Sequence, residues 1–587
     1  MKTFHLLVIF FCQMLPQHTC VVIKSGSHST IAGFNNTDLP ECILPSTYIK
    51  RERKNQATEN TPQTSDPNEK PAYIFNKLEM LTLSSAPQDK RDSDDQLNVY
   101  TIIDERGVPY NWDALECQWR YIYEQCLQCD PSSLPLVITV PHMKDEVSVA
   151  VMEKYFDLVF NKFKVPVLQV VIEPLAVALS IGKTSALVVD MGSSGCSVTP
   201  IIDGTIVKSS VMRSKYGGDF LDYEIHKAVS RLLESEGRVG ERLEGKKEKE
   251  GKPEEIDGSE VDAEGDLKMG DNDATSADTN TLSGIQQKAT APDSLQVWSE
   301  SNTWMQDFKM TMLQVSDRDF LEIEKYYAEQ TEMLIKQQEQ LQQYVAADSQ
   351  ADGKPHNVSL DEATIASITN SNLLLQKRHY LYKPENKTLS FKIGECYRLG
   401  EYIFNPSLAS EKFSKEDGLG ELMVKAVRKA GGSISSVGTS ILGSLGPTVA
   451  TTSGRNNGPL GDNIFAGSGD STIAATTTAG TSAPSTIGIS TTPEQVYSSL
   501  LSNVIITGGT SMINGVEQRI IKELSTAFPQ YKITTYMNQN LLDRKLQSWT
   551  GAVAMANLPS WELGKWYTKE DVLAKTARST QRTGGSK

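Results

Sequence analysis

The chain has 587 residues, of which 39% are hydrophobic and 22% are charged, and its formal net charge is −15. This length is too great for one hydrophobic core, so several lobes are expected. The acidic balance disfavours a general nucleic-acid-binding protein, and any DNA role would run through a partner protein. Eight cysteines are sparse for this length, as in a protein of a reducing compartment.

The sequence predicts neither a metal site nor a membrane span. Cys126 and Cys129 form the only close cysteine pair, and no second pair follows at zinc-ribbon spacing. Residues 1–20 form a hydrophobic N-terminal extension, and three interpretations stay open: a secretory signal, a plain extension, or a start placed too far upstream. No other segment has the ~20 apolar residues that a membrane span requires.

The region 21–232 alternates apolar strands with helices, which indicates an α/β lobe. It opens with a strand, a small-residue turn at Gly26 and Ser27, and a second strand that ends near Phe34. A helix is predicted to begin after Asn111, whose side chain suits an N-cap. Further strands are predicted at 134–141 and 167–172, and further helices at 145–162 and 173–181.

Polar, low-complexity stretches interrupt this alternation. Residues 233–290 are acidic and rich in glycine, and residues 411–493 are rich in Ser, Thr and Gly. Both are predicted to be disordered insertions, because they lack the apolar period that a packed element needs. Residues 52–95 are predicted to form a polar loop around a short strand at 73–75.

Two regions after these interruptions regain helix and strand patterns and complete the predicted organisation. Residues 291–410 are assigned to a second lobe that includes a long helix from about 319 to 345. Residues 494–587 are assigned to a C-terminal part that ends in a helix from about Gly551.

A second hairpin, residues 186–201, repeats the arrangement of the first, with Asp190 and Gly192 at the start of its turn. Backbone N–H groups of a small-residue turn can approach a phosphate closely, because no side chain blocks them. Two such hairpins that face each other across a cleft predict a phosphate clamp.

Blocks spread over most of the ordered chain resemble the actin family and fall in its order. They include Ala32-Gly33-Phe34, Asn111-Trp112-Asp113, Gly217-Gly218-Asp219-Phe220, Phe404-Asn405-Pro406-Ser407 and Trp549-Thr550-Gly551. The resemblance implies the α/β, two-lobed ATPase fold of actin and Hsp70, here with large disordered insertions. It also implies that one set of residues lines a nucleotide site, with Lys309 beside the base: Gly26, Ser27, Asp190, Gly192, Gly217, Gly218, Lys309, Gly508, Gly509 and Thr510.

The departures from the family pattern fall on the catalytic groups. Lys24 stands where actin has an aspartate that organises the metal, and Ile31 replaces its phosphate-reaching lysine. Ser193 replaces a second aspartate, and Glu173 replaces the glutamine that positions the attacking water. Hydrolysis needs a held metal and an oriented water. We therefore predict no catalytic residue, no hydrolysis and no required cofactor, whereas ATP binding stays open.

Within the family, the degenerate clamp and the insertions most resemble the nuclear class-nine actin-related proteins of fungi. This implies a structural subunit of SWI/SNF- and RSC-type chromatin remodellers in the nucleus. There it would pair with another actin-related protein on a helix of the remodeller ATPase, and the insertions would oppose a homopolymer. Contact and lobe packing are both open roles for four C-terminal residues: Val553, Leu558, Trp561 and Trp566.

Two other functions stay open at this point. The first is a cytoskeletal actin-related protein such as the pointed-end subunit of dynactin, which would tolerate a weak clamp. The second is an ATPase of the Hsp70 branch, against which Ile31 argues.

Overall fold

The computed structural model describes residues 19–51, 72–85, 97–247, 294–348, 362–442, 492–558 and 566–574. It divides into two compact units, Met1–Ile225 with Ser294–Lys587, and His226–Asp293. The first unit holds both large sheets and every site residue that the structure describes. Among the described residues, no helix is both long and apolar enough to cross a membrane.

The first large sheet has the strand order β17-β8-β7-β1-β2-β3. Strands β1 and β2 form an antiparallel hairpin, and β1, β7 and β8 run parallel. Every residue of β7 is buried, as expected for a parallel strand covered on both faces. The strands are β1 Val21–Ser25, β2 Ser29–Phe34, β3 Cys42–Pro45, β7 Leu136–Val140, β8 Leu168–Ile172 and β17 Trp566–Tyr567.

The second large sheet repeats this plan, with the order β11-β10-β9-β15-β16 and β12 beside β10. Strands β9 and β10 form the hairpin, and β9, β15 and β16 run parallel. Each hairpin turn therefore follows the C-terminal end of a strand that has a parallel neighbour. The strands are β9 Ala186–Met191, β10 Cys196–Ile202, β11 Thr205–Ile206, β12 Met212–Ser214, β15 Val504–Thr507 and β16 Thr535–Met537.

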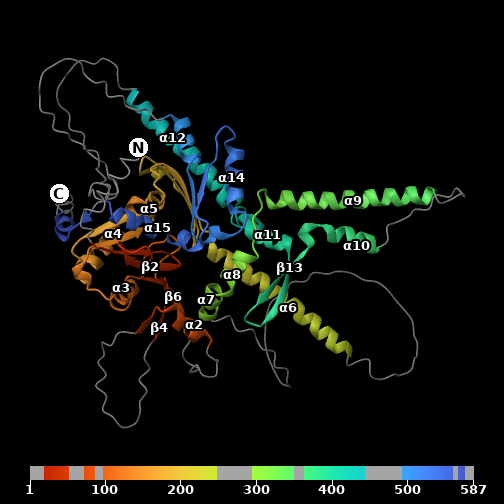
Figure 1. Ribbon diagram of the computed structural model, residues 1–587, viewed down its shortest axis with the longest axis horizontal. Helices are drawn as coiled ribbons and strands as arrows, with labels where there is room; N and C mark the ends of the chain where they lie inside the picture. The colour runs from red at the N-terminus through yellow and green to blue at the C-terminus, as the bar shows by residue number, and fades with distance from the viewer. Residues whose placement is uncertain are drawn as a thin grey trace, which may run out of the picture. The chain divides into compact units, whose positions relative to one another are not determined.

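Two small sheets and a set of helices complete the described chain (Figure 1). The small sheets join β4 Thr47–Arg51 to β5 Ala72–Ile74 and β6 Val99–Thr101, and β13 Lys377–Tyr382 to β14 Lys387–Lys392. The helices are α2 Lys77–Ser85, α3 Trp112–Tyr121, α4 Asp145–Phe156, α5 Glu173–Ser180, α6 Gly218–Lys247, α7 Ser294–Asn302, α8 Trp304–Thr311, α9 Phe320–Asp348, α10 Glu362–Ser371, α11 Ile393–Glu401, α12 Leu419–Leu442, α13 Pro493–Leu501, α14 Val516–Ala527 and α15 Leu541–Ala556.

Helices α5 and α15 lie side by side and join the two large sheets (Figure 1). A Cβ atom at Gly551 of α15 would overlap the carbonyl oxygen of Ala176 on α5, so only glycine permits this approach. Trp549 is 1% exposed, and its indole N–H donates to the carbonyl of Val22 on β1 at 3.2 Å. Helix α15 is thus fixed to the first sheet by packing and by a buried hydrogen bond.

Several predicted elements are confirmed. Asn111 caps α3, and its side chain accepts a hydrogen bond from the backbone N–H of Ala114 at 3.1 Å. The short strand β5 and the long helix α9 lie where the sequence placed them. Gly182 ends α5 with φ +67°, a conformation that favours glycine.

The prediction that 411–493 is a flexible insertion is wrong for its first part. Residues 419–442 form α12, whose Leu419, Met423, Val427 and Ala430 are buried. These positions follow the spacing of a helix face, which outweighs the local Ser and Gly content. Residues 443–491 lie outside the described part of the chain.

Two other boundaries differ from the sequence-based ones. Helix α6 continues to Lys247, into the stretch 233–290, because this part keeps strong helix formers such as Glu, Leu, Arg and Lys. Residues 248–293 are not among those described.

Helix α15 begins at Leu541, ten residues before the predicted start. The side chain of Asn540 accepts a hydrogen bond from the backbone N–H of Leu542 at 3.1 Å and caps the helix there. Helix α2 also falls in a stretch predicted to be a loop.

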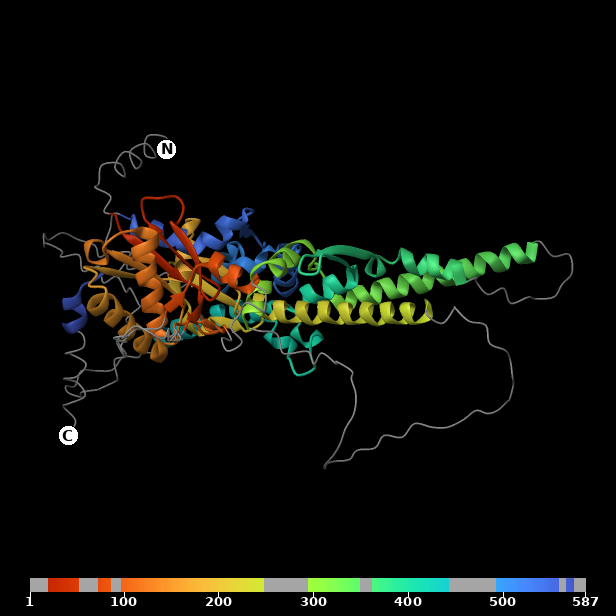
Figure 2. The same cartoon turned by 90° about the horizontal axis from the view of Figure 1, so that it is seen from below.

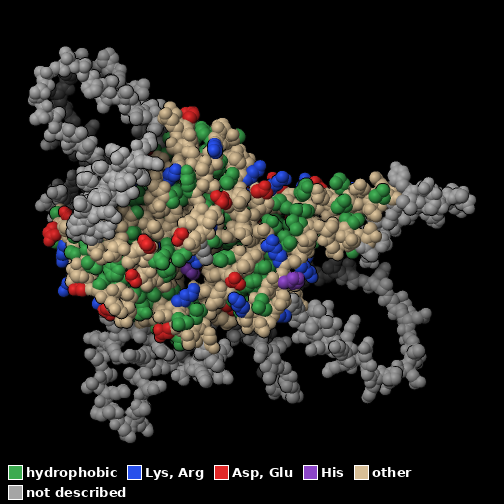
Figure 3. Space-filling view, viewed as in Figure 1, with side chains coloured by type: hydrophobic (Ala, Val, Ile, Leu, Met, Phe, Trp, Pro, Cys, Tyr) green, Lys and Arg blue, Asp and Glu red, His purple; other side chains and the backbone are tan. Residues whose placement is uncertain are grey.

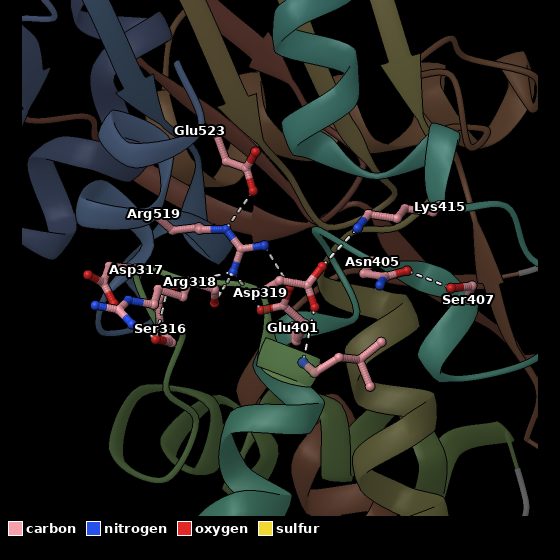
Figure 4. A network of polar contacts seen from close by, with 11 residues as sticks. Ser316, Asp317, Arg318, Asp319, Glu401, Asn405, Ser407, Lys415, Arg519 and Glu523 are labelled. Atoms are coloured by element: carbon pink, nitrogen blue, oxygen red, sulfur yellow. Dashed lines mark hydrogen bonds and ion pairs between the residues drawn. The ribbon is translucent and has the colours of Figure 1, made fainter. Parts of the chain in front are cut away.

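A buried ion-pair network joins α11 to α14 (Figure 4). The guanidinium of Arg519 donates to both carboxylate oxygens of Glu401, at 2.7 and 2.8 Å, and to Glu523 at 2.7 Å. It also donates to the backbone carbonyls of Ser316 and Arg318. This two-pronged geometry compensates the cost of burying both charges and orients the loop before α9.

Helix α9 extends away from the sheets with α10 beside it (Figures 1 and 2). Its Ile323 and Tyr327 are partly buried, whereas Leu334 and Leu341 are 42% and 51% exposed. On the face seen in Figure 3, Lys and Arg are interspersed with Asp and Glu, so charge is mixed there.

Candidate functional site

A pocket with an empty volume of about 1240 Å³, open to solvent, lies between the two hairpin turns. Both sheets contribute to it, and so do the start of α6, helix α8 and the loop after β15. The pocket lining includes every predicted nucleotide residue except Gly217: Gly26, Ser27, Asp190, Gly192, Gly218, Lys309, Gly508, Gly509 and Thr510. The structure thus brings together residues that are up to 484 positions apart in the sequence (510 − 26).

The second turn is locked to its neighbours. The carbonyl of Gly192 accepts from the backbone N–H of Gly218 at 3.0 Å and from the hydroxyl of Thr510 at 2.9 Å. The hydroxyl of Ser193 donates to Asp219 Oδ1 at 2.5 Å. A Cβ atom at Gly217 would lie 2.5 Å from the backbone nitrogen of Gly195, so Gly217 supports the turn from outside the pocket.

Gly508 follows β15 beside Asp190 and needs the freedom of glycine. Its φ is +89°, and a Cβ atom there would overlap the carbonyl oxygen of Met191 and lie 2.6 Å from Asp190 Oδ1. The close approach of these strands therefore places Asp190 at the floor of the pocket.

The first turn is closed by a hydrogen bond from Gly26 N to Ser29 O at 3.0 Å. The ammonium nitrogen of Lys24 lies only 2.5 Å from the position that a Cβ atom at Gly26 would take. Lys24 therefore folds back over its own turn, and Gly26 leaves the room for it. The hydroxyl of Ser25 is buried and makes no hydrogen bond within the described chain.

Four backbone N–H groups of the two turns are available to a ligand. Those of Ser27 and His28 in the first turn, and of Ser193 and Ser194 in the second, donate to no acceptor among the described residues. All four residues line the pocket. Turn N–H groups of this kind can form an anion-binding concavity.

Positive charge gathers around these turns. Burial and the charges of Lys309, Lys545, Lys77 and Lys24 lower the pKa of His28 to about 4. Burial, Lys77 and Lys309 also lower the pKa of Lys545. The pocket therefore has an electropositive wall that attracts an anion.

Lys309 is part of a structural ion pair. Its ammonium lies 2.8 Å from Asp222 Oδ1, and both side chains are nearly buried. Burial raises the pKa of Asp222, while Lys309 and a hydrogen bond from the hydroxyl of Ser301, at 2.6 Å, oppose that rise. The actin resemblance implies that Lys309 lies beside the nucleotide base, and its place in the pocket is compatible with this. Its charge, however, is already compensated by Asp222.

The C-terminal contact candidates are placed only in part. Val553 and Trp566 are partly buried and pack against the cluster of Val22, Ile31 and Trp549. Leu558, just after α15, donates its backbone N–H to Met555 O at 3.3 Å. Trp561 lies outside the described residues. Packing of the lobe accounts for the positions of Val553 and Trp566.

A family model described as "Actin" matches residues 16–571. The chain belongs to the actin family. The resemblance in the sequence blocks is thereby confirmed, and the paired sheets and hairpin turns described above are the actin-type fold expected from it.

This actin-family chain is 44% identical to "Actin-related protein 7" of Saccharomyces cerevisiae over 575 residues, 98% of the chain and 100% of that relative. It is 23% identical to "Actin-related protein 4" of Debaryomyces hansenii over 560 residues, 94% and 93% of the two chains. A partial match, 24% identical over 212 residues, 36% of this chain and 44% of the relative, is "SWI/SNF and RSC complexes subunit arp42" of Schizosaccharomyces pombe. The full-length relative from Saccharomyces is of class seven, whereas the motifs pointed to class nine.

The pocket of this actin-family chain is a poor fit for the Mg²⁺ ion that accompanies a nucleotide in the fold. Burial and the charge of Glu173 raise the pKa of Asp190 to about 6, and the positive charges of Lys24 and Arg213 oppose the rise. The described residues contain no group of three or more His, Cys, Asp or Glu side chains suited to a metal ion. Mg²⁺ needs oxygen ligands in octahedral array, and a fixed ammonium at the first turn repels it.

Sequence reasoning missed two cationic groups of this pocket, Arg213 and Lys545, and the imidazole of His28, whose lowered pKa keeps it neutral near pH 7. Lys545 lies one helical turn before Trp549 on α15. The actin-like block that begins at Trp549 would have included Lys545 if it had been extended towards the N-terminus. Nothing local marks Arg213, which reaches the pocket because β12 pairs with β10.

Proposed function

We propose that this chain is a non-catalytic structural subunit of an ATP-dependent chromatin remodeller of the SWI/SNF or RSC type, and that it acts in the nucleus. The full-length similarity to an actin-related protein carries this proposal. The match to a protein named as a subunit of SWI/SNF and RSC complexes supports the kind of assembly.

The finer proposal is that the chain pairs with another actin-related protein on a helical segment of the remodeller ATPase, and contacts chromatin only through that assembly. The C-terminal region after α15 is the proposed contact, because Leu558 is only partly buried there. A partner helix with an apolar face would suit an apolar contact of this kind. The chain forms no homopolymer under this proposal.

The pocket supports a role without hydrolysis. Lys24 replaces an acidic group at the first turn, and Ser193 is committed to Asp219 by a hydrogen bond. Glu173 accepts from the hydroxyl of Thr139 at 3.3 Å. An attacking water would lack several of the groups that orient it. No cofactor is required for the proposed role, although ATP remains a ligand that the pocket can hold.

Affinity purification of the tagged full chain, followed by mass spectrometry, tests the proposed function. We expect a remodeller ATPase and a second actin-related protein in near-equal amounts with the bait. Recovery of dynein-associated proteins instead would overturn it in favour of a cytoskeletal role. Leu558→Glu should reduce recovery of the ATPase subunit, whereas Leu381→Glu, on exposed strand β13, should leave it unchanged.

A further inference from the structure

We propose that the pocket binds the phosphate chain of a nucleoside triphosphate without a divalent cation, and that the ammonium of Lys24 takes the place of the metal. The inference goes beyond the proposed subunit role and does not depend on any partner protein. It starts from the observation that the residues of this pocket are a poor fit for the Mg²⁺ ion that accompanies a nucleotide in the actin fold.

The position of Lys24 provides the first step. It lies on β1, opposite Ile31 on β2 and Thr139 on β7, at the end that leads into the first turn. Its ammonium folds over Gly26 rather than pairing with a carboxylate. A cation held at the centre of a phosphate-binding turn compensates phosphate charge directly.

The second step concerns the charged side chains of the pocket that form no ion pair among the described residues. Lys309 is paired with Asp222, and Asp219 accepts from Ser193. Three cations of the pocket, Lys24, Arg213 and Lys545, make no ion pair among the described residues. Three carboxylates of the pocket, Asp190, Glu173 and Asp219, remain against them. Glu173 and Asp219 accept hydrogen bonds from the neutral hydroxyls of Thr139 and Ser193, which leave their charges in place. These charges balance in number, and the ammonium of Lys24 lies at the first turn, so positive charge is already present where a phosphate would bind.

The unsatisfied hydrogen-bonding groups provide the third step. The backbone N–H groups of Ser27, His28, Ser193 and Ser194 approach from opposite turns. The hydroxyl of Ser25, which is 5% exposed, also has no partner within the described chain. A buried hydroxyl without a partner is costly, and a phosphate oxygen would satisfy it.

The test is calorimetric titration of the purified full chain with ATP, once in EDTA and once in excess Mg²⁺. We expect Kd values within threefold of each other in the two conditions. Lys24→Ala should weaken binding in EDTA by tenfold or more. Lys24→Asp should restore an acidic group at the first turn and make binding depend on Mg²⁺. Lys336→Ala, on exposed helix α9, is the matched control and should change nothing.

Three results would overturn the proposal: no ATP binding in either condition, wild-type binding that requires Mg²⁺, or a Lys24→Ala variant with unchanged affinity in EDTA. The first two comparisons use the wild-type chain alone, so they stand even where a variant fails to fold. Loss of the remodeller partners in affinity purification would overturn the proposed function and leave these binding results intact.

Discussion

Charges are paired in one region of the molecule and unpaired in another. The first region is the ion-pair network between α11 and α14 (Figure 4), and the second is the pocket between the hairpin turns. In the network, Arg519 and Glu401 have side chains 3% and 1% exposed, and each charge meets its partner at hydrogen-bond distance. In the pocket, Lys24 and Asp190 belong to the same cavity, yet neither forms an ion pair within the described chain.

This difference separates structural charge from charge that is available to a ligand. A buried charge is tolerated when a partner and hydrogen bonds compensate it, and is costly otherwise. The network therefore holds the fold together, whereas the pocket retains a cost that a bound anion would relieve. Four substitutions can break or sharpen this contrast, and they are ordered by expected effect.

The largest effect is expected for Glu401→Gln, which removes the buried two-pronged partner of Arg519 and leaves it only the pair with the partly exposed Glu523. We expect the free energy of unfolding to fall by about 3–5 kcal/mol. Denaturant unfolding followed by circular dichroism measures it. Lys425→Ala removes an exposed pair with Glu416 and serves as control, with a loss of about 0–1 kcal/mol. A loss for Glu401→Gln no larger than that of the control would show that the network is not structural.

Asp190→Asn should have the opposite sign and raise the free energy of unfolding at pH 7 by about 2–3 kcal/mol. Its pKa is raised from 3.8 to about 6 in the folded chain, so the folded state binds more protons than the unfolded state between these values. The contribution of Asp190 to stability therefore falls as pH rises from 4 to 6 and is level above that range.

Thermal unfolding of wild type and Asp190→Asn from pH 4 to 8 checks this sign. The two curves should converge towards pH 4 and separate towards pH 6, with the variant more stable. A variant that is less stable than wild type at pH 7 would mean that Asp190 is already compensated by the cations around it.

Thr510→Val should cost about 1 kcal/mol, because it removes the hydroxyl that donates to the carbonyl of Gly192. Thr82→Val, which removes an exposed hydrogen bond to Leu78 O on α2, is the control and should cost less. Chemical denaturation of both variants measures the difference. Equal losses would contradict the locked geometry of the second turn.

The smallest effect on stability is expected for Ser25→Ala, which should leave the free energy of unfolding unchanged or raise it by up to about 1 kcal/mol, because it removes a buried hydroxyl that has no partner to lose. The same variant should weaken ATP binding in EDTA by severalfold. Unfolding and titration of one preparation give both values. A stability loss above 1 kcal/mol would indicate that the hydroxyl already has a partner in the free chain.

Local signals predicted the hairpins well, whereas the set of site residues came from the resemblance to the actin family. The small-residue turns at Gly26 and Gly192, the cap at Asn111 and the end of the helix before Gly182 each depend on a few adjacent residues. Each of these features is determined by residues that are close in sequence, so it can be inferred without knowledge of the rest of the fold.

Long-range pairing could not be inferred in the same way. The partner of Lys309 is 87 residues away (309 − 222), on α6, so its commitment to Asp222 has no local signal. Composition also misled at α12, which is rich in small residues yet packs. On α9, Leu334 and Leu341 are apolar yet stay exposed. Burial depends on which neighbour meets the face, and one sequence does not contain that information.

Steady-state phosphate release by the purified chain, with ATP and Mg²⁺ in excess, tests most directly the claim that this pocket compensates charge without catalysing hydrolysis. The account predicts a rate indistinguishable from that of a blank and from that of Asp190→Ala. A clear rate above the blank that disappears in Asp190→Ala would contradict it, because Asp190 would then anchor a working metal site.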